Sequence, residues 1–154
     1  MRSSIPKVVG ILMIIFASLG LLFGLLGLAG NSASTEGLKD VPEFKTYLTM
    51  NMVYGLVGLA ISVIHLLAGV SAVRYKANAP GLAKLYGVTN IVVSVGWGVV
   101  VFAWLKPALE KAAGGIGAAA LGVGVIFGII LAVAWPVIVL ALMSRPAAKA
   151  ACTN

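Results

Sequence analysis

The long apolar runs of this chain hold few side chains that can form hydrogen bonds or exchange protons. The only histidine, His65, lies in the run from Met52 to Val73, which contains no Asp, Glu, Lys or Arg. As a helix, this run reaches roughly 33 Å, enough to cross the hydrocarbon core of a bilayer. Serine and asparagine residues lie at a depth similar to that of His65 in the apolar runs. We therefore expect one midplane polar layer made of Ser18, Ser62, His65, Asn90 and Ser94.

The imidazole of His65 needs a partner on another helix, because lipid offers no hydrogen bond. We expect Ser94 or Asn90 to be that partner. An ionisable residue inside a membrane is a functional hypothesis by default. Three uses of His65 remain open: a neutral hydrogen bond that fixes helix register, part of a proton or solute pathway, or a ligand to a cofactor.

The same inventory excludes most catalytic sites within one chain. No Asp or Glu lies in an apolar run, so a paired-carboxylate acid–base site is excluded there. One histidine cannot form a bis-histidine haem site, and the single cysteine, Cys152, cannot form an intrachain disulfide or a multi-cysteine metal site. We therefore expect a protein that is not an enzyme and that has no catalytic residue, no metal site and no cofactor.

The elements that position these groups are four apolar runs, predicted as spans over residues 8–29, 52–73, 86–105 and 117–143. Hydrophobic residues make up 61% of the chain and charged residues 10%, whereas a soluble domain carries about 25% charged residues. The fold class is therefore all-α: an integral membrane protein of four transmembrane helices, arranged as two helical hairpins in one bundle. The single membrane domain, 1–154, includes outer loops at 31–51 and 106–116, a cytoplasmic loop at 74–85 with a Pro80-Gly81 turn, and a mobile cytoplasmic tail at 144–154.

Small residues recur at helical spacing along the spans and predict close helix packing. In the second span, small and polar residues share one predicted seam: Gly55, Gly58, Ser62, His65, Gly69 and Ala72. The glycines that we expect at helix contacts are Gly20, Gly24, Gly27, Gly55, Gly58, Gly69, Gly124 and Gly128. Pro136 predicts a kink or hinge in the fourth span, because it cannot donate to the carbonyl of Ala132.

The charged residues predict the orientation and argue against nucleic acid as a partner. The formal net charge is +7, but the basic residues flank the apolar runs and do not form one basic face. The N-terminus, the 74–85 loop and the tail together carry seven Lys or Arg and no acid, while the other side carries four basic residues and all four acids. The positive-inside rule then places both termini in the cytoplasm.

The leading functional expectation is a non-enzymatic assembly, scaffold or accessory subunit that associates through glycine-rich helix packing as a homo-oligomer or within a membrane protein complex. The alternative is a pore or transporter subunit that uses the polar layer around His65. Membrane lipids are the other expected partners. An abundance of Ala, Gly and Val is typical of GC-rich bacterial genomes, so we expect a multi-pass protein of the bacterial cytoplasmic (inner) membrane.

Overall fold

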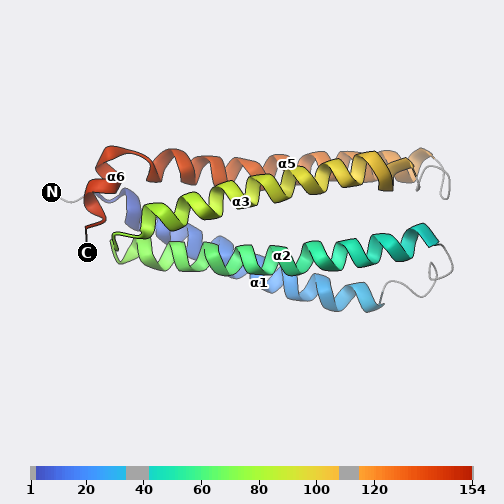
Figure 1. Cartoon of the computed structure of the whole chain (residues 1–154), viewed down its shortest axis with the longest axis horizontal. Helices are drawn as coiled ribbons and strands as arrows, with labels where there is room; N and C mark the ends of the chain where they lie inside the picture. Colours follow the sequence, from blue (N-terminus) through green and yellow to red (C-terminus); the bar gives the residue numbers. More distant parts are fainter. Residues whose placement is uncertain (1–2, 34–41, 108–114, 154) are drawn as a thin grey trace.

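The computed structural model describes residues 3–33, 42–107 and 115–153, and all regular structure in those ranges is helical. Long helices run through most of the chain, and a short one follows them near the C-terminus (Figure 1). Their bounds are α1 Ile5–Ala33, α2 Pro42–Val73, α3 Ala79–Val100, the π-helical turn η2 Val101–Leu105, α5 Gly115–Met143 and α6 Pro146–Ala151.

Four of these helices are long and apolar enough to cross a membrane, as the sequence predicts. Their candidate spans are Ile5–Ala29, Leu48–Val73, Ala79–Trp104 and Gly122–Met143. The third helix begins at Ala79, before the predicted span start at Tyr86. Pro80 lies in its first turn. The N–H groups of a first turn have no acceptor within the helix, so a proline there costs no hydrogen bond. Pro80-Gly81 therefore opens a helix, although we expected a turn there.

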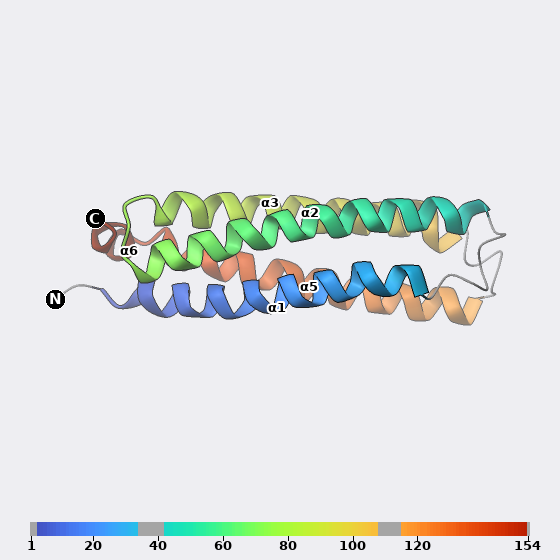
Figure 2. The same cartoon turned by 90° about the horizontal axis from the view of Figure 1, so that it is seen from below.

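The long helices lie side by side in a bundle (Figures 1 and 2). The most extensive contact is between α1 and α2; α3 packs along α5, and α2 also packs along α3. By contrast, α1 and α5 touch over only a small area. The first described residues and α6 lie at the same end of the bundle as the α2–α3 connection (Figure 1).

The hydrophobic core lies at this end. It unites residues from all four long helices and from the tail: Val9, Met13, Ile61, Ala68, Ala72, Ala79, Ala83, Tyr86, Val139, Met143 and Cys152. The tail, which we expected to be mobile, instead forms α6, and its Ala148, Ala151 and Cys152 are buried. Small apolar faces on α6 explain the difference, because their burial offsets the cost of ordering a short segment.

A tight turn joins α2 to α3 at the same end. Tyr75 has a φ of 53°, and its N–H donates to the carbonyl of Ala72 while that of Lys76 donates to the carbonyl of Ser71. These two bonds form a Schellman motif, in which the left-handed position is more often glycine. The motif ends α2 abruptly, so α3 can begin at Ala79 and return along it.

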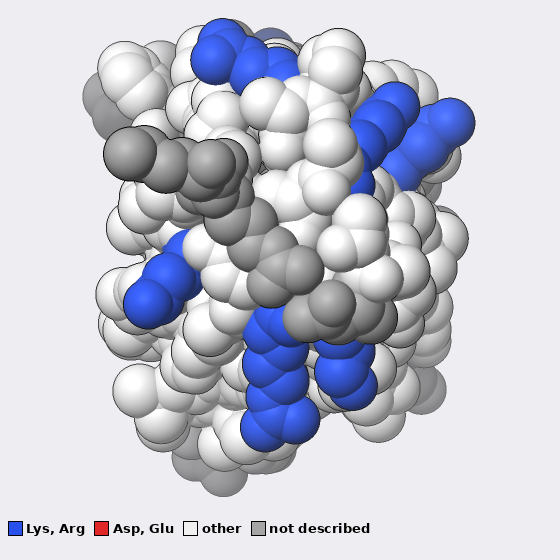
Figure 3. All heavy atoms as spheres, turned by 90° about the vertical axis from the view of Figure 1, so that its left-hand side faces the viewer, with Lys and Arg blue, Asp and Glu red and all other residues white. Residues whose placement is uncertain are grey.

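Basic side chains surround this end of the molecule. Viewed end-on, the surface displays several Lys and Arg side chains and no Asp or Glu (Figure 3). The described basic residues of the N-terminus, the 74–85 loop and the tail are Lys7, Arg74, Lys76, Lys84, Arg145 and Lys149. Three of the four acidic residues, Glu36, Asp40 and Glu110, lie outside the described residues.

Glycines set the separation of α1 and α2. A Cβ atom on Gly10 would lie 2.7 Å from the Gly69 carbonyl oxygen and 2.8 Å from the Val73 nitrogen, and one on Gly69 would lie 2.9 Å from the Gly10 carbonyl oxygen. The two backbones are thus in direct contact, which only glycine permits. Between α3 and α5, Gly87 instead accommodates the side chain of Leu140, and Gly98 that of Ile129.

Candidate functional site

An open central cavity of about 860 Å³ lies between the four long helices. Phe16 and Phe23 of α1 and Leu131 and Ile138 of α5 line it and are also exposed on the outside of the bundle. The exposure of these lining residues shows that the cavity is open on the side of α1 and α5. Its lining residues are Phe16, Gly20, Phe23, Ile61, Ser62, His65, Tyr86, Asn90, Leu131, Ala132, Ala134, Trp135, Pro136 and Ile138.

His65 is buried against two aromatic rings at the wall of this cavity. Its imidazole stacks on Tyr86, with 3.8 Å between ring centroids and an interplanar angle of 8°. The indole Nε1–H of Trp135 donates a hydrogen bond of 3.2 Å to Nε2 of His65. A histidine that accepts at Nε2 carries its proton on Nδ1. The structure therefore gives His65 a different partner from the Ser94 or Asn90 that we expected, and a fixed tautomer.

Asn90 has its own partner on α5. Its Nδ2 donates a hydrogen bond of 2.8 Å to the carbonyl oxygen of Ala132. This is the carbonyl that Pro136, four residues later in α5, cannot satisfy because proline has no N–H. Asn90 of α3 supplies this missing donor, so the unpaired carbonyl of α5 is satisfied by a side chain of a neighbouring helix.

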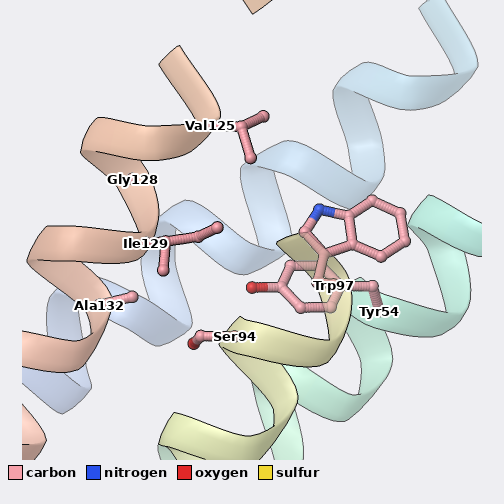
Figure 4. Close-up of a pocket in the computed structure, with 7 residues that line it drawn as sticks. All are labelled: Tyr54, Ser94, Trp97, Val125, Gly128, Ile129 and Ala132. Atoms are coloured by element: carbon pink, nitrogen blue, oxygen red, sulfur yellow. The ribbon is translucent and has the colours of Figure 1, made fainter. Parts of the chain in front are cut away.

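A second, smaller cavity of about 220 Å³ adjoins the first and shares Ala132 with it. Tyr54 of α2 stacks on Trp97 of α3 at a centroid distance of 4.5 Å. The Tyr54 and Ser94 hydroxyls share a hydrogen bond, and Figure 4 shows the Tyr54 hydroxyl directed toward Ser94. Across the cavity lie Val125, Gly128, Ile129 and Ala132 of α5.

The structure divides the polar layer predicted from the sequence. Ser62, His65 and Asn90 line the central cavity together, and Ser94 lines its smaller neighbour. Ser62 donates to the Gly58 carbonyl of its own helix at 2.9 Å. Ser18 belongs to neither cavity lining and lies exposed on α1, because the apolar run that holds it buries the adjacent Ala17 instead.

The predicted packing glycines also fall into two groups. A Cβ atom on Gly20 would lie 3.0 Å from Ser62 Oγ, and one on Gly24 or Gly55 would lie 2.8 Å from a Leu59 or Leu28 methyl carbon. Gly69 contacts the α1 backbone, as described above. No described atom of a neighbouring helix lies within 4 Å of the Cβ positions of the other four, namely Gly27, Gly58, Gly124 and Gly128. Pro136, the predicted hinge, is fully buried.

Several residues of the site were not among those singled out from the sequence. Trp135 and Tyr86 hold His65, and Tyr54 holds Ser94. The sequence signal that could have found them is a Trp or Tyr at the same depth as another polar residue. The N–H or O–H of such a ring can form the hydrogen bond that the buried polar residue needs. Gly10 begins the small-residue series of the first span, and its position opposite Gly69 follows from the antiparallel pairing of α1 and α2.

The chemistry that this arrangement can perform is hydrogen bonding without charge. Among the described residues, no Asp, Glu, Lys or Arg lines either cavity, and no three His, Cys, Asp or Glu side chains come together as a potential metal site. Every fully buried side-chain nitrogen or oxygen in those ranges has a partner. The site thus presents neutral donors, neutral acceptors and aromatic rings to an otherwise apolar space.

The chain was also compared with known families and proteins. No protein-family model matches it, and no curated protein or solved structure shows significant similarity to it.

Proposed function

We propose that this protein is a non-enzymatic, multi-pass membrane protein that serves as an assembly or accessory subunit. It associates with a second copy of itself, or with other membrane proteins in a complex, through helix faces that carry open glycines. The observation that carries this proposal is the contrast between the two groups of glycines. Those between α1 and α2 are filled by a neighbouring helix, whereas Gly124 is exposed with no described atom of another helix within 4 Å of its Cβ position. Gly128, which also lines the smaller cavity, is exposed and open in the same way.

The contact between α1 and α2 supports this use of glycine. In a bilayer, helices gain little from hydrophobic burial against each other, so close van der Waals packing and hydrogen bonds drive association. At Gly10 and Gly69 the chain gains that packing by backbone contact. The Gly122–Met143 span is the least buried of the four. Its open glycines offer a partner helix the same close approach.

The arrangement in the membrane is part of the proposal. The contact pattern supports two helical hairpins, α1–α2 and α3–α5, and the basic end supports a cytoplasmic location for both termini by the positive-inside rule. We place the protein in the bacterial cytoplasmic membrane. In this arrangement the basic side chains serve orientation and contact with lipid headgroups, and nucleic acid is not a partner.

Association is tested by adding bulk to the open glycine face. The variants Gly124→Leu and Gly128→Leu are compared with Val123→Leu, a control on an exposed side chain of the same helix. Cross-linking in native membranes and size-exclusion chromatography with light scattering in mild detergent measure the associated fraction. We expect both glycine variants to lower that fraction several-fold and the control to leave it unchanged. Equal associated fractions in all four proteins would contradict the proposal.

A pore or transporter subunit is the second candidate, and the polar lining of the central cavity favours it. Ser62, His65 and Asn90 line that cavity together. Against it, the core at the basic end is filled by Met13, Tyr86, Val139 and other buried side chains, so conduction would need a path between several copies. Flux of small solutes into liposomes that is lost in His65→Ala would support this candidate, and flux unaffected by the substitution would remove it.

A further inference from the structure

We propose that the central cavity binds a neutral, membrane-soluble lipid with a planar, carbonyl-bearing ring, of the isoprenoid quinone class. The ligand enters from the bilayer between α1 and α5, and its ring lies beside Asn90, His65 and Trp135. This inference concerns a ligand site that the proposed assembly function does not require. It stands on the size, access, charge and hydrogen bonding of the cavity.

The cavity is large enough and is open on the correct side. Its volume of about 860 Å³ lies within the range of roughly 300–1,000 Å³ that is typical of small-molecule sites. The packed core closes the basic end, so a ligand cannot enter from there. The slight contact between α1 and α5 leaves an entrance bordered by Phe23 and Leu131, which are 65% and 71% exposed. A ligand that uses this entrance comes from the hydrocarbon region of the bilayer.

The charge of the lining selects a neutral head group. None of the described residues that line the cavity is Asp, Glu, Lys or Arg. A phosphate, carboxylate or ammonium group at this depth would lose its hydration without gaining a counter-ion, which is strongly unfavourable. Phospholipids and fatty acids therefore cannot place their head groups here. A quinone ring is polar but uncharged, so it avoids this cost.

The hydrogen-bonding groups of the lining suit carbonyl oxygens. Asn90 donates one amide hydrogen to the Ala132 carbonyl and has a second amide hydrogen, at the wall of the cavity that it lines. His65 accepts from Trp135 at Nε2, and its Nδ1 therefore carries a donor hydrogen. Both donors are neutral and are held by contacts on other helices. An alkyl chain would use neither of them, whereas a ring carbonyl accepts from such groups.

Aromatic rings at the entrance complete the match to a planar ligand. Phe16 of α1 and Trp135 of α5 lie 4.8 Å apart between centroids and are tilted by 53°. Both line the cavity, one on each helix that borders the opening. Offset-stacked and edge-to-face contacts stabilise aromatic neighbours, so a flat ring bound in the cavity can make such contacts with both.

The test uses the full chain in phosphatidylcholine nanodiscs and decylubiquinone as the probe. The chain has three tryptophans, and a Trp97→Phe/Trp104→Phe background leaves only Trp135. Quinones quench indole fluorescence on contact. We expect saturable quenching of Trp135. Asn90→Leu should weaken the apparent affinity about tenfold or more, and Ser18→Leu, on the exposed face of α1, should leave it unchanged. Far-ultraviolet circular dichroism checks that each variant is folded.

If Asn90→Leu does not fold, Ala134→Phe replaces it, because Ala134 lines the cavity from an exposed position and its enlargement fills the entrance. Quenching that rises linearly with probe concentration, with one slope in all variants, would overturn the proposal, because it reports partition into the bilayer alone. Mass spectrometry of an organic extract of the purified protein is a second readout. A co-purified isoprenoid quinone supports the assignment, and enrichment of a sterol, fatty acid or phospholipid in its place overturns it.

Discussion

At the scale of single residues, the hydrogen bond from Asn90 to Ala132 compensates for the donor that Pro136 removes from α5. A proline in a membrane helix leaves one carbonyl without its helical donor, and lipid cannot supply another. Asn90 Nδ2 lies 2.8 Å from that oxygen. The effects of substituting Asn90 and Pro136 on stability should therefore depend on each other.

A double-mutant cycle tests this dependence. Asn90→Leu should lower the free energy of unfolding by about 1 kcal/mol, within the range measured for hydrogen bonds between membrane helices. In a Pro136→Ala background the same substitution should cost less, because an alanine in place of the proline has an N–H that can donate to the Ala132 carbonyl. Unfolding by sodium dodecyl sulfate in mixed micelles, followed by circular dichroism, gives the four free energies. A coupling free energy of zero would show that Asn90 does not act through this carbonyl.

The bond from Trp135 to His65 gives a second prediction at this scale. Trp135→Phe keeps a ring beside Phe16 but removes the indole N–H that donates to Nε2 of His65. In the native protein, ¹⁵N NMR of the imidazole should report the Nδ1–H tautomer, and in Trp135→Phe both ring ¹⁵N shifts should move. Trp97→Phe is the matched control, because Trp97 lines the smaller cavity and contacts Tyr54. Ring shifts that are identical in all three proteins would contradict the assignment.

At the scale of elements, the seam predicted on α2 serves two different neighbours. Gly55, Ser62 and Gly69 lie against α1, whereas His65 and Ala72 meet the interior, where His65 contacts α3 and α5. Each set repeats every seven residues, and the two sets are offset by three. Heptad spacing therefore places a residue on a face but does not say which helix that face meets.

The closest approach of α1 and α2 makes the next prediction. Gly10→Ala should lower the free energy of unfolding by about 1–3 kcal/mol, because its Cβ would overlap backbone atoms that cannot move aside without separating the helices. Gly27→Ala, in the same helix with open space at its Cβ position, should be neutral or slightly stabilising, since alanine is the better helix former. Detergent unfolding of both variants measures the difference. Equal effects of the two substitutions would mean that the backbones do not meet at Gly10.

How much the sequence predicts follows from the same residues. Apolar length alone predicts four membrane-length helices, because a bilayer demands long uncharged runs. The sequence also identifies the unsatisfied carbonyl of Ala132 and the polar side chain of Asn90, but each separately. Their pairing depends on how far α3 and α5 are rotated about their axes. A membrane helix is apolar both where it faces lipid and where it faces protein, so its sequence carries little information on that rotation. Ser18 illustrates the loss: its depth is suitable, but its side of the helix is exposed.

At the scale of the whole molecule, packing is uneven along the bundle. The core joins all four long helices and the tail at the basic end, whereas the cavities lie at the level of His65 and toward the other end. One end of the bundle therefore holds the fold together, and the remainder has interior space for a ligand or a partner. Both proposals place binding in this open part and leave the packed end undisturbed.

The orientation of the packed end is the last prediction, and it follows from charge. Six of the described basic residues gather at this end, whereas Lys45 and Lys106 lie toward the other. Acids are absent from the surface displayed at the basic end, so the positive-inside rule places it in the cytoplasm. In a Cys152→Ala background, which removes the only cysteine, Thr46→Cys and Lys149→Cys each introduce one thiol at an exposed position. In intact bacterial cells that express the protein, a membrane-impermeant maleimide should label Thr46→Cys directly and Lys149→Cys only after permeabilisation. The reverse pattern would place the basic end outside, where the rule disfavours it, and would require a partner or a masked charge to hold it there. Labelling of both sites without permeabilisation would mean that the helices do not separate two compartments, and the membrane arrangement would then be wrong.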